Sequence, residues 1–552
     1  MDTLLSAMIP TLVVLHLVVA PYTKVEESFN MQATHDMLAY DIFRRDAREY
    51  LSAHYDHFDF PGAVPRTFTG SLLLSRLGAP LITAVGFQYA QFIVRAVLGL
   101  ASSAALLYFK HRIGLAFGKP TARWFTVLQA SQFHVIFYAS RLLPNMLAFP
   151  LTTMALAQLI PHPDSKKQGE RYVTAIAWLT IATAVFRSEL AILMVTVTLY
   201  GWLVHRASLP RIIKLFSVSF VLSLLLSLPC DSYFWQKPLW PELWGFYYNA
   251  VLGSSSDWGV SPWHYYFTSA LPKILTNPLT STILIPFALW NSGTARQTRA
   301  LVVPSLLFVA IYSIQPHKEA RFIFYVAPPL TAAAALGANY IFSRRKKSYL
   351  FMAASQIIAG SVLVSFAIST AMLLISSLNY PGGEALSELK TLVTSLSSPE
   401  IQTAAVHTDV LSCMTGVTLF GQHPYWPGEH GSAHETVLLT FDKTEDEITL
   451  RNPLFWERFD YALAEDPGKP LGRWETIGVV EGFAGIEVLK PGKPVRNEDI
   501  EAAQQQQRVL GRGALVKRIR SFVREKTGGW WVGPRMEPRV YILRKSRESE
   551  AK

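Results

Sequence analysis

The sequence has only two cysteines, Cys230 and Cys413, among its 552 residues. Two cysteines exclude a disulfide-rich scaffold, a zinc finger and an iron–sulfur cluster held by thiolates. Charged residues are also scarce, at 16% of the chain, whereas a typical soluble domain has about 25%. Hydrophobic residues make up 50%, which excludes intrinsic disorder for most of the chain. These figures predict a polytopic membrane protein.

Motifs of several other protein classes are missing from the sequence. It has no Walker motif and no GxGxxG segment after a strand-like run, so nucleotide-driven chemistry is not expected. The His and Asp residues of segment 35–59 lack the spacing of metal ligands, so no metal site is expected. The net charge is +11, but the basic residues lie in short loops between apolar runs. This placement indicates membrane orientation, with lipid as a partner and no nucleic acid.

Long apolar runs are abundant. A helix needs about 20 mostly apolar residues to cross the hydrocarbon core of a bilayer. By this measure the sequence predicts about 11 transmembrane helices, and residues 70–87 are either a further span or a half-buried segment. The predicted spans centre on 3–20, 88–108, 123–140, 145–160, 172–187, 189–205, 212–229, 276–290, 300–315, 322–342 and 349–377.

Basic clusters orient these spans, and a change of composition divides the chain. With 70–87 uncounted, all five clusters of Lys and Arg between the spans lie on one side, which the positive-inside rule puts in the cytosol. The other, lumenal side receives the large first loop, 21–69. From Asn379 onward the apolar runs shorten to strand length. We expect a transmembrane domain over 1–378 and a small soluble α/β or α+β domain, also lumenal, over 379–552.

Two adjacent carboxylates follow the first predicted span on the lumenal side. Ionisable groups next to the bilayer are costly, so each is a candidate for function. Glu26 and Glu27 point about 100° apart on a helix or turn, so they cannot occupy one pocket equally. One could act as a general base while the other orients it, or the pair could be an ordinary acidic helix cap.

Basic and polar residues follow at further lumenal boundaries. A phosphate could bind to Arg66 and to the group His317, Lys318 and Arg321, where the positive-inside rule disfavours bases. Other candidates for substrate binding have ordinary structural alternatives: a tight turn for Arg141 and Asn145, an ion pair for Arg187 and Glu189, and an interfacial aromatic loop for Asp231, Trp263 and His264.

At these same places the sequence resembles a known family. The segments KVEESFN, FPGAVPRTF, RLLPN, FRSEL, DSYFW and PHKEARF resemble signature segments of the GT-C mannosyltransferases of glycosyltransferase family 22. NYPGG, at 379–383, extends the resemblance toward the soluble domain. There are two departures: relatives have an Asp-Glu pair where this chain has Glu26 and Glu27, and Ala320 replaces an acid of the HKEERF motif.

The resemblance implies a fold, a reaction and a location. It implies a multi-pass GT-C protein of the endoplasmic reticulum membrane, with a lumenal active site. The implied donor is dolichyl-phosphate mannose, a co-substrate, and no cofactor is implied. The segments PYTKVEESFNMQATHDML and YDHFDFPGAVPRTF are similar to one member of the family in particular. That similarity implies as acceptor the dolichyl-diphosphate-linked Man7GlcNAc2 oligosaccharide of N-glycosylation, which receives mannose in α-1,6 linkage.

The resemblance also implies roles for particular residues in an inverting mechanism. Glu26 aligns with the Asp of the relatives' pair and is expected to be the base, assisted by Glu27. The donor phosphate is expected to bind Arg66, His317, Lys318 and Arg321.

Two alternatives remain open from the sequence. One is an α-1,2-mannosyltransferase of the same family that acts on the lipid-linked oligosaccharide or on the glycosylphosphatidylinositol (GPI) anchor. The other is a lipid transporter or scramblase, which the composition alone permits. The absence of an evident internal repeat weakens the transporter hypothesis.

Overall fold

The structure is a computed structural model that describes residues 2–162, 165–205, 207–396, 402–423, 426, 437–492 and 508–546. The chain forms two compact units. Unit 1 comprises Met1–Val19, Phe29–Leu81 and Phe92–Leu373, and unit 2 comprises Ala20–Ser28, Ile82–Gln91 and Leu374–Lys552. Unit 2 therefore contains two short N-terminal segments in addition to the region in which the sequence predicts a soluble domain.

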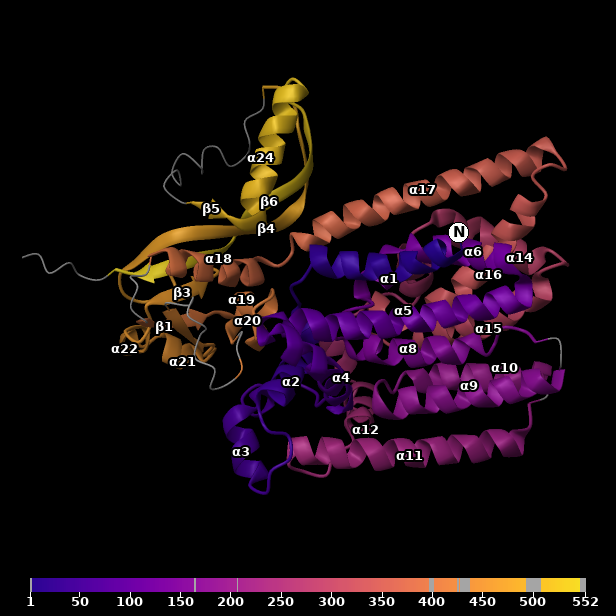
Figure 1. The fold of residues 1–552 in the computed structure, drawn as a ribbon, viewed down its shortest axis with the longest axis horizontal. Helices are drawn as coiled ribbons and strands as arrows, with labels where there is room; N and C mark the ends of the chain where they lie inside the picture. Colours follow the sequence, from indigo (N-terminus) through magenta and orange to yellow (C-terminus); the bar gives the residue numbers. More distant parts are fainter. Residues whose placement is uncertain are drawn as a thin grey trace, which may run out of the picture. The chain divides into compact units, whose positions relative to one another are not determined.

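Unit 1 is built from helices, and its long helices run along one common direction in Figure 1. Helix α9 packs against α8, α10 and α11, and α16 packs against α6 and α15. The helices wholly or mostly in unit 1 are α1 (Asp2–Val19), α2 (Ser28–Ala39), α3 (Ala47–His54), α4 (Thr69–Val85), α5 (Ala90–Phe117), α6 (Lys119–Ala130), α7 (Phe133–Tyr138), α8 (Pro144–Ala157), α9 (Ser165–Val185), α10 (Leu190–His205), α11 (Leu209–Trp235), α12 (Pro241–Phe246), α13 (Leu271–Leu275), α14 (Ile285–Trp290), α15 (Ala295–Tyr312), α16 (Ala327–Ser343) and α17 (Tyr349–Ser377).

Five helical segments of the described chain are long and apolar enough to cross a membrane. They are Asp2–Val19, Phe87–Phe117, Leu209–Trp235, Ala320–Ser343 and Tyr349–Ser377. Every other predicted span overlaps at least one helix outside these five segments, and the ambiguous segment 70–87 overlaps α4. The eleven-span topology stays a prediction.

The sequence predicts one continuous helix over 123–140, but the structure divides this run into α6 and α7. Gln132 has an extended backbone, with φ −86° and ψ 104°, and it separates the two helices. Its side chain accepts a hydrogen bond from Gln129 Nε2 (2.8 Å) and donates one to Thr331 Oγ1 (2.7 Å). Buried amides need such partners, so this polar contact interrupts an otherwise apolar run.

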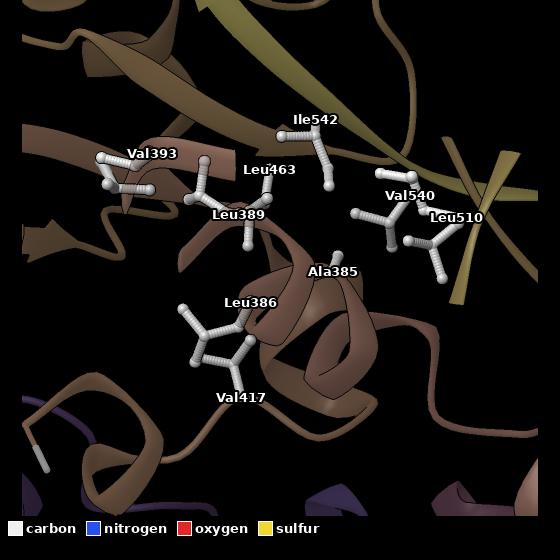
Figure 2. Packing of buried hydrophobic residues seen from close by; sticks show 11 residues of the cluster. Ala385, Leu386, Leu389, Val393, Val417, Leu463, Leu510, Val540 and Ile542 are labelled. Atoms are coloured by element: carbon white, nitrogen blue, oxygen red, sulfur yellow. The ribbon is translucent and has the colours of Figure 1, made fainter. Parts of the chain in front are cut away.

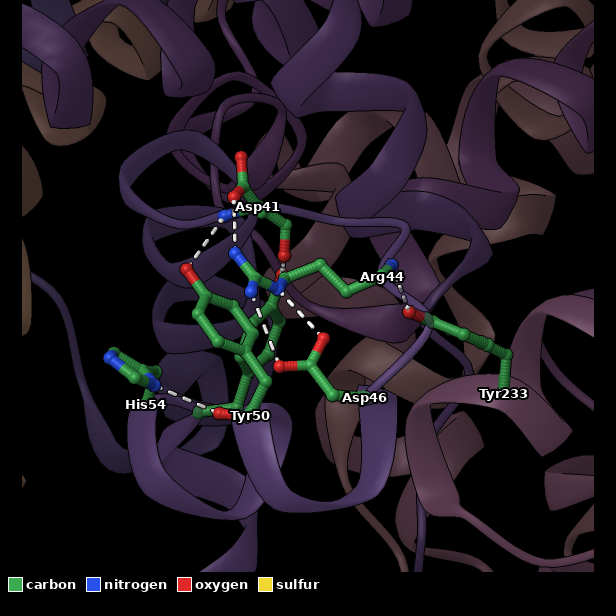
Figure 3. A network of polar contacts seen from close by, with 7 residues as sticks. Asp41, Arg44, Asp46, Tyr50, His54 and Tyr233 are labelled. Carbon is green, nitrogen blue, oxygen red and sulfur yellow. Dashed lines mark hydrogen bonds and ion pairs between the residues drawn. The ribbon is translucent and has the colours of Figure 1, made fainter.

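The first part of the chain after α2 carries a surface network of polar contacts (Figure 3). The guanidinium of Arg44 pairs with Asp46 at 2.9 Å and with Asp41 at 3.2 Å. The ring of Tyr50 lies 4.5 Å below that guanidinium, and the Tyr233 hydroxyl accepts a hydrogen bond from the Arg44 amide. These contacts fasten the turn between α2 and α3 to the end of α11.

Unit 2 contains a mixed six-stranded sheet of order β2-β1-β3-β6-β4-β5. Strands β1, β2 and β3 are parallel, and β6 runs antiparallel to β3 and β4. The strands are β1 (Gln402–Thr408), β2 (Val437–Asp442), β3 (Tyr461–Ala464), β4 (Trp474–Leu489), β5 (Val509–Leu510) and β6 (Trp531–Lys545); the helices are α18 (Pro381–Leu396), α19 (Val410–Met414), α20 (Leu419–Gln422), α21 (Glu447–Leu450), α22 (Pro453–Trp456) and α24 (Gly511–Lys526).

The period-two pattern of the strands divides the core of unit 2 between the two faces of the sheet. Leu463 and Ile542 pack with Leu389 of α18 on one face (Figure 2). Their neighbours Ala462 and Leu543 belong to a second cluster, with aromatic residues around Trp456. Successive side chains of a strand point to opposite faces, so one strand supplies both clusters.

Candidate active site

A buried ion pair lies at the turn between α9 and α10. Arg187 Nε donates to Glu189 Oε1 over 2.7 Å, and their side chains are only 13% and 7% exposed. The two charges are close enough to compensate for much of the cost of burial. The sequence analysis leaves open a structural ion pair or a role in substrate binding, and the structure shows that the pair is formed.

Two further side chains complete the surroundings of Glu189. Asn145, in the first turn of α8, donates through Nδ2 to Glu189 Oε1 (3.2 Å) and to the Tyr325 hydroxyl (2.9 Å). The Tyr325 hydroxyl in turn lies 3.4 Å from the same carboxylate oxygen. Three predicted segments, around 145, 187 and 322, therefore meet at one carboxylate.

Glu242 is a third member of this group, and the sequence analysis missed it. It lies in α12, is buried, and accepts a hydrogen bond from the Ser188 amide over 2.7 Å. Burial raises the pKa of Glu242 to about 7, an effect opposed by Arg187 and Arg66 and increased by Glu189. An acid directly after Pro241, within an aromatic segment between apolar runs, was the available signal.

Arg66 lies among the same charges, although it precedes α4 in the first loop. Burial lowers the pKa of Arg66 to about 10, with the charges of Arg187 and Arg321 adding to the effect and those of Glu242 and Glu189 opposing it. Within the part of the chain that the structure describes, the Arg66 guanidinium makes no hydrogen bond or ion pair. Its N–H donors are therefore available to an anionic ligand.

Arg321 and His317 share one carboxylate. Arg321 Nη2 donates to Glu319 Oε1 over 2.7 Å, and His317 Nε2 lies 3.1 Å from the same oxygen. The ring of Phe322 lies beside two guanidinium groups, 5.4 Å from Arg187 Cζ and 5.8 Å from Arg321 Cζ. We name the group of Arg66, Arg187, Glu189, Glu242, Glu319 and Arg321 the arginine cluster. It combines three guanidinium groups with three carboxylates.

Lys318 has a different environment from its neighbours. Its ammonium donates to the backbone carbonyls of Gln315 (2.6 Å), Ser261 (2.9 Å) and Pro316 (3.4 Å). Burial lowers its pKa. These three bonds use the three ammonium donors and fasten the loop around Ser261 to the turn before η8 (Ala320–Val326). In the structure Lys318 therefore holds the loop, and its predicted contact with the donor phosphate stays a prediction.

The remaining candidates, which the sequence places on the predicted lumenal side, lie outside the arginine cluster. Asp231 accepts from the Phe68 amide (2.7 Å) and from Thr67 Oγ1 (3.1 Å), so it anchors the residues just before α4. Arg141 is buried, with its guanidinium 4.2 Å from the ring of Phe137. The other two are exposed: Trp263, at 72%, and His264, whose Nδ1 lies 3.1 Å from Thr268 Oγ1. Their roles in substrate binding stay predictions.

The first-loop carboxylates belong to unit 2. Glu27 is buried, and its Oε1 accepts the Lys24 amide over 3.1 Å, which closes the 3₁₀ turn η1 (Val25–Glu27). Glu26 is exposed on the same turn. The two adjacent side chains therefore differ in their environment, because that of Glu27 holds the turn and that of Glu26 is exposed. Their predicted catalytic roles stay predictions.

The fold of the chain is shared with a solved membrane glycosyltransferase. The crystal structure of ArnT from Cupriavidus metallidurans bound to undecaprenyl phosphate matches with a TM-score of 0.53 and 12% identity, over 86% of this chain and 95% of that chain. At this identity the likeness shows the fold alone, which is the helical GT-C membrane fold.

The family follows from the sequence comparison. The model of the Alg9-like mannosyltransferase family, a glycosyltransferase family 22 group, matches residues 7–407, and the chain belongs to this family. It is therefore a glycosyltransferase, specifically a mannosyltransferase, which confirms the family expected from the sequence segments.

Three relatives show where the chain lies within the family. The Dol-P-Man:Man(7)GlcNAc(2)-PP-Dol alpha-1,6-mannosyltransferase of Saccharomyces cerevisiae is 32% identical over 88% of this chain and 89% of its own length. The protein of the same name from Arabidopsis thaliana is 32% identical over 87% and 90%. The GPI alpha-1,2-mannosyltransferase 3 of Danio rerio is 29% identical, over only 38% and 37%.

Proposed function

We propose that this protein transfers mannose from dolichyl-phosphate mannose, in α-1,6 linkage, onto the dolichol-linked Man7GlcNAc2 oligosaccharide. The observation that carries the proposal is the similarity over nearly nine tenths of the chain to relatives named for that reaction. Similarity to the GPI α-1,2 enzyme covers little more than a third of the chain. The product serves as a precursor for protein N-glycosylation.

The protein works, in this proposal, in the membrane of the endoplasmic reticulum. About 11 helices cross the bilayer, in agreement with the spacing of apolar runs, and the active site and the C-terminal domain face the lumen. The basic clusters between the spans support this orientation through the positive-inside rule.

The reaction is an inverting displacement with Glu26 as general base. The Glu26 carboxylate takes the proton of the acceptor mannose 6-hydroxyl as that oxygen bonds to the anomeric carbon of the donor. The bond between the anomeric carbon and the phosphate oxygen breaks, and dolichyl phosphate leaves with the electron pair. The β-linked donor thus gives an α linkage. The exposure of Glu26 and the hydrogen-bonded position of Glu27 support this division of roles.

The arginine cluster binds the donor phosphate in this proposal. The N–H donors of Arg66 are available to the phosphate, and Arg321 and His317 both contact Glu319, a carboxylate of the same cluster. A pKa of about 7 leaves Glu242 partly protonated at neutral pH, so the cluster keeps an excess of positive charge. Guanidinium groups balance the charge that develops on a leaving phosphate. The donor lipid is a co-substrate, and the reaction as proposed uses no cofactor.

The test is transfer by the purified protein from dolichyl-phosphate mannose to defined lipid-linked acceptors, with linkage analysis of the product. We expect an α-1,6-linked mannose on Man7GlcNAc2, and an activity loss of about 100-fold or more in Glu26→Gln, since a general base contributes typically 10²–10⁴-fold. Glu49→Gln, which neutralises another exposed first-loop glutamate, is the matched control and should keep full activity.

Two results would contradict the proposal. An α-1,2-linked product would identify the protein as an α-1,2-mannosyltransferase of the same family. Full activity of Glu26→Gln would remove that carboxylate from the role of base.

A further inference from the structure

The first-loop turn that carries Glu26 and Glu27 is held by a socket in unit 2. Tyr22 lies directly before this turn, and its ring packs on Gly383, so closely that a Cβ at Gly383 would overlap the ring. A Cβ at Gly416 would likewise lie only 3.1 Å from the Cβ of Tyr22. The Tyr22 hydroxyl is hydrogen-bonded to Ser387, one turn further along α18.

The walls of this socket are themselves joined by hydrogen bonds. Thr415 Oγ1 accepts from the Gly382 amide over 3.0 Å, and the Thr415 carbonyl accepts from the Gly383 amide over 3.1 Å. The glycine pair of the NYPGG segment therefore meets the Thr415–Gly416 turn backbone to backbone. Gly416 has φ +123°, a conformation that favours glycine.

Contacts on both sides of Tyr22 extend this attachment. The Lys24 ammonium lies 5.3 Å from the ring centre of Tyr380, the residue that precedes α18. The Pro21 carbonyl accepts from Gln91 Nε2 over 3.1 Å, and the Oε1 of the same amide accepts from the Thr418 hydroxyl over 2.6 Å. Contacts at residues 21, 22 and 24 thus tie the turn to the C-terminal part of the chain.

We propose that the socket formed by Tyr380, Gly383, Ser387 and Gly416 is a positioning device for catalysis, and that Tyr22 is its positioning residue. The proposal rests on the proposed role of Glu26. Only three residues separate Tyr22 from Glu26, and Glu26 lies within the 3₁₀ turn that Glu27 closes. A displacement of the ring therefore displaces the carboxylate. The C-terminal domain thereby serves the reaction through the first loop.

The experiment compares Tyr22→Leu, Tyr22→Phe and Tyr461→Leu in the full-length protein. Tyr461 packs against the core of unit 2, and its replacement is the control for loss of a ring in that unit without a change in the socket. Misplacement of a catalytic group by about 1 Å can cost 10²-fold. We expect Tyr22→Leu to lower kcat by about 10- to 100-fold, with the KM values for both substrates within about twofold of wild type. Tyr22→Phe keeps the ring and should retain most of the activity.

Hydrogen exchange of the amides of residues 23–28, without substrate, provides a second readout. We expect faster exchange in Tyr22→Leu and unchanged exchange in Tyr461→Leu. Wild-type kcat in Tyr22→Leu, or equal losses of activity per folded molecule in both Leu variants, would overturn the proposal. If Glu26→Gln stays active while exchange still increases in Tyr22→Leu, the proposed role of Glu26 as base is wrong, but the socket still holds the turn. If Glu26→Gln is inactive and Tyr22→Leu is fully active, only the proposed role of the socket is wrong.

Discussion

Arg44 and Arg187 each lie between carboxylates, one at the surface of unit 1 and the other inside it. The Arg44 side chain is 41% exposed, and its partners Asp41 and Asp46 are 68% and 51% exposed (Figure 3). The Arg187 pair is 13% and 7% exposed, with Glu242 buried beside it. Water screens the first network, so its ion pairs contribute little, whereas charges of the second depend on one another.

The difference shows how similar side chains serve different purposes. In the Arg44 network the guanidinium is already paired with two carboxylates, those of Asp41 and Asp46. The arginine cluster includes Arg66, whose donors are not used within the described chain. A surface network of this kind shapes a loop, whereas a buried cluster with unused donors suits the binding of an anion.

The largest expected effect comes from removing one charge of the buried pair. We expect Arg187→Met to lower stability by about 3–5 kcal/mol, because Glu189 and Glu242 lose their buried counter-charge. The measurement is unfolding of the purified protein by heat or denaturant. The double variant Arg187→Met/Glu189→Gln should recover part of the loss, and a double variant no more stable than the single one would contradict this coupling.

Replacement of Arg66 tests the excess of donors in the same cluster. We expect Arg66→Met to raise the KM for the donor lipid and to lower kcat/KM by about 10- to 100-fold, since a hydrogen bond to a charged group contributes about 1.5–3 kcal/mol. Steady-state kinetics at varied donor concentration measure this effect. Arg66→Lys keeps the charge and should be intermediate, and wild-type kinetics in Arg66→Met would exclude Arg66 as a phosphate ligand.

Glu242 should make stability depend on pH. Its folded-state pKa of about 7 exceeds its ordinary value of 4.5, so the folded protein binds this proton more tightly than the unfolded chain. The resulting contribution is fully present below pH 4.5 and is lost as pH rises through 7. We expect Glu242→Gln to be more stable than wild type by about 2–3 kcal/mol at pH 8 and by less than about 1 kcal/mol at pH 5. Parallel pH profiles of the two proteins would contradict the shift.

The surface network should give the smallest effect. Arg44→Ala removes two exposed ion pairs. We expect a loss of stability much smaller than that of Arg187→Met, with unchanged mannose transfer. Thermal unfolding at low and high salt measures it, and the difference should shrink at high salt. A loss of stability as large as that of Arg187→Met would contradict the idea that exposure determines how much each network contributes to stability.

The apolar runs of the sequence were sufficient to predict where the long helices lie. The predicted span 349–377 coincides with α17, because a long apolar run can satisfy its backbone only as a helix. The break at Gln132 was not predictable, because it depends on Thr331, which lies 199 positions away.

Pattern alone was less informative about the candidate site. The rule that ionisable groups beside a span are costly identified Arg66, Arg187, Glu189 and Arg321, and they do gather in one cluster. The same rule did not distinguish Lys318 from these residues, although the Lys318 ammonium donates to backbone carbonyls and does not join the cluster. Which partner a charge meets depends on packing between distant segments.

Composition, apolar length and short motifs are local properties, so they were enough to predict the family, the helical membrane character and most of the charged candidates. Packing established three further facts: Glu242 lies beside Arg187, the Lys318 ammonium is bonded to backbone carbonyls, and Tyr22 packs on Gly383. Each of these depends on a contact between segments far apart in the chain, and such contacts exist only after the helices and the sheet have packed.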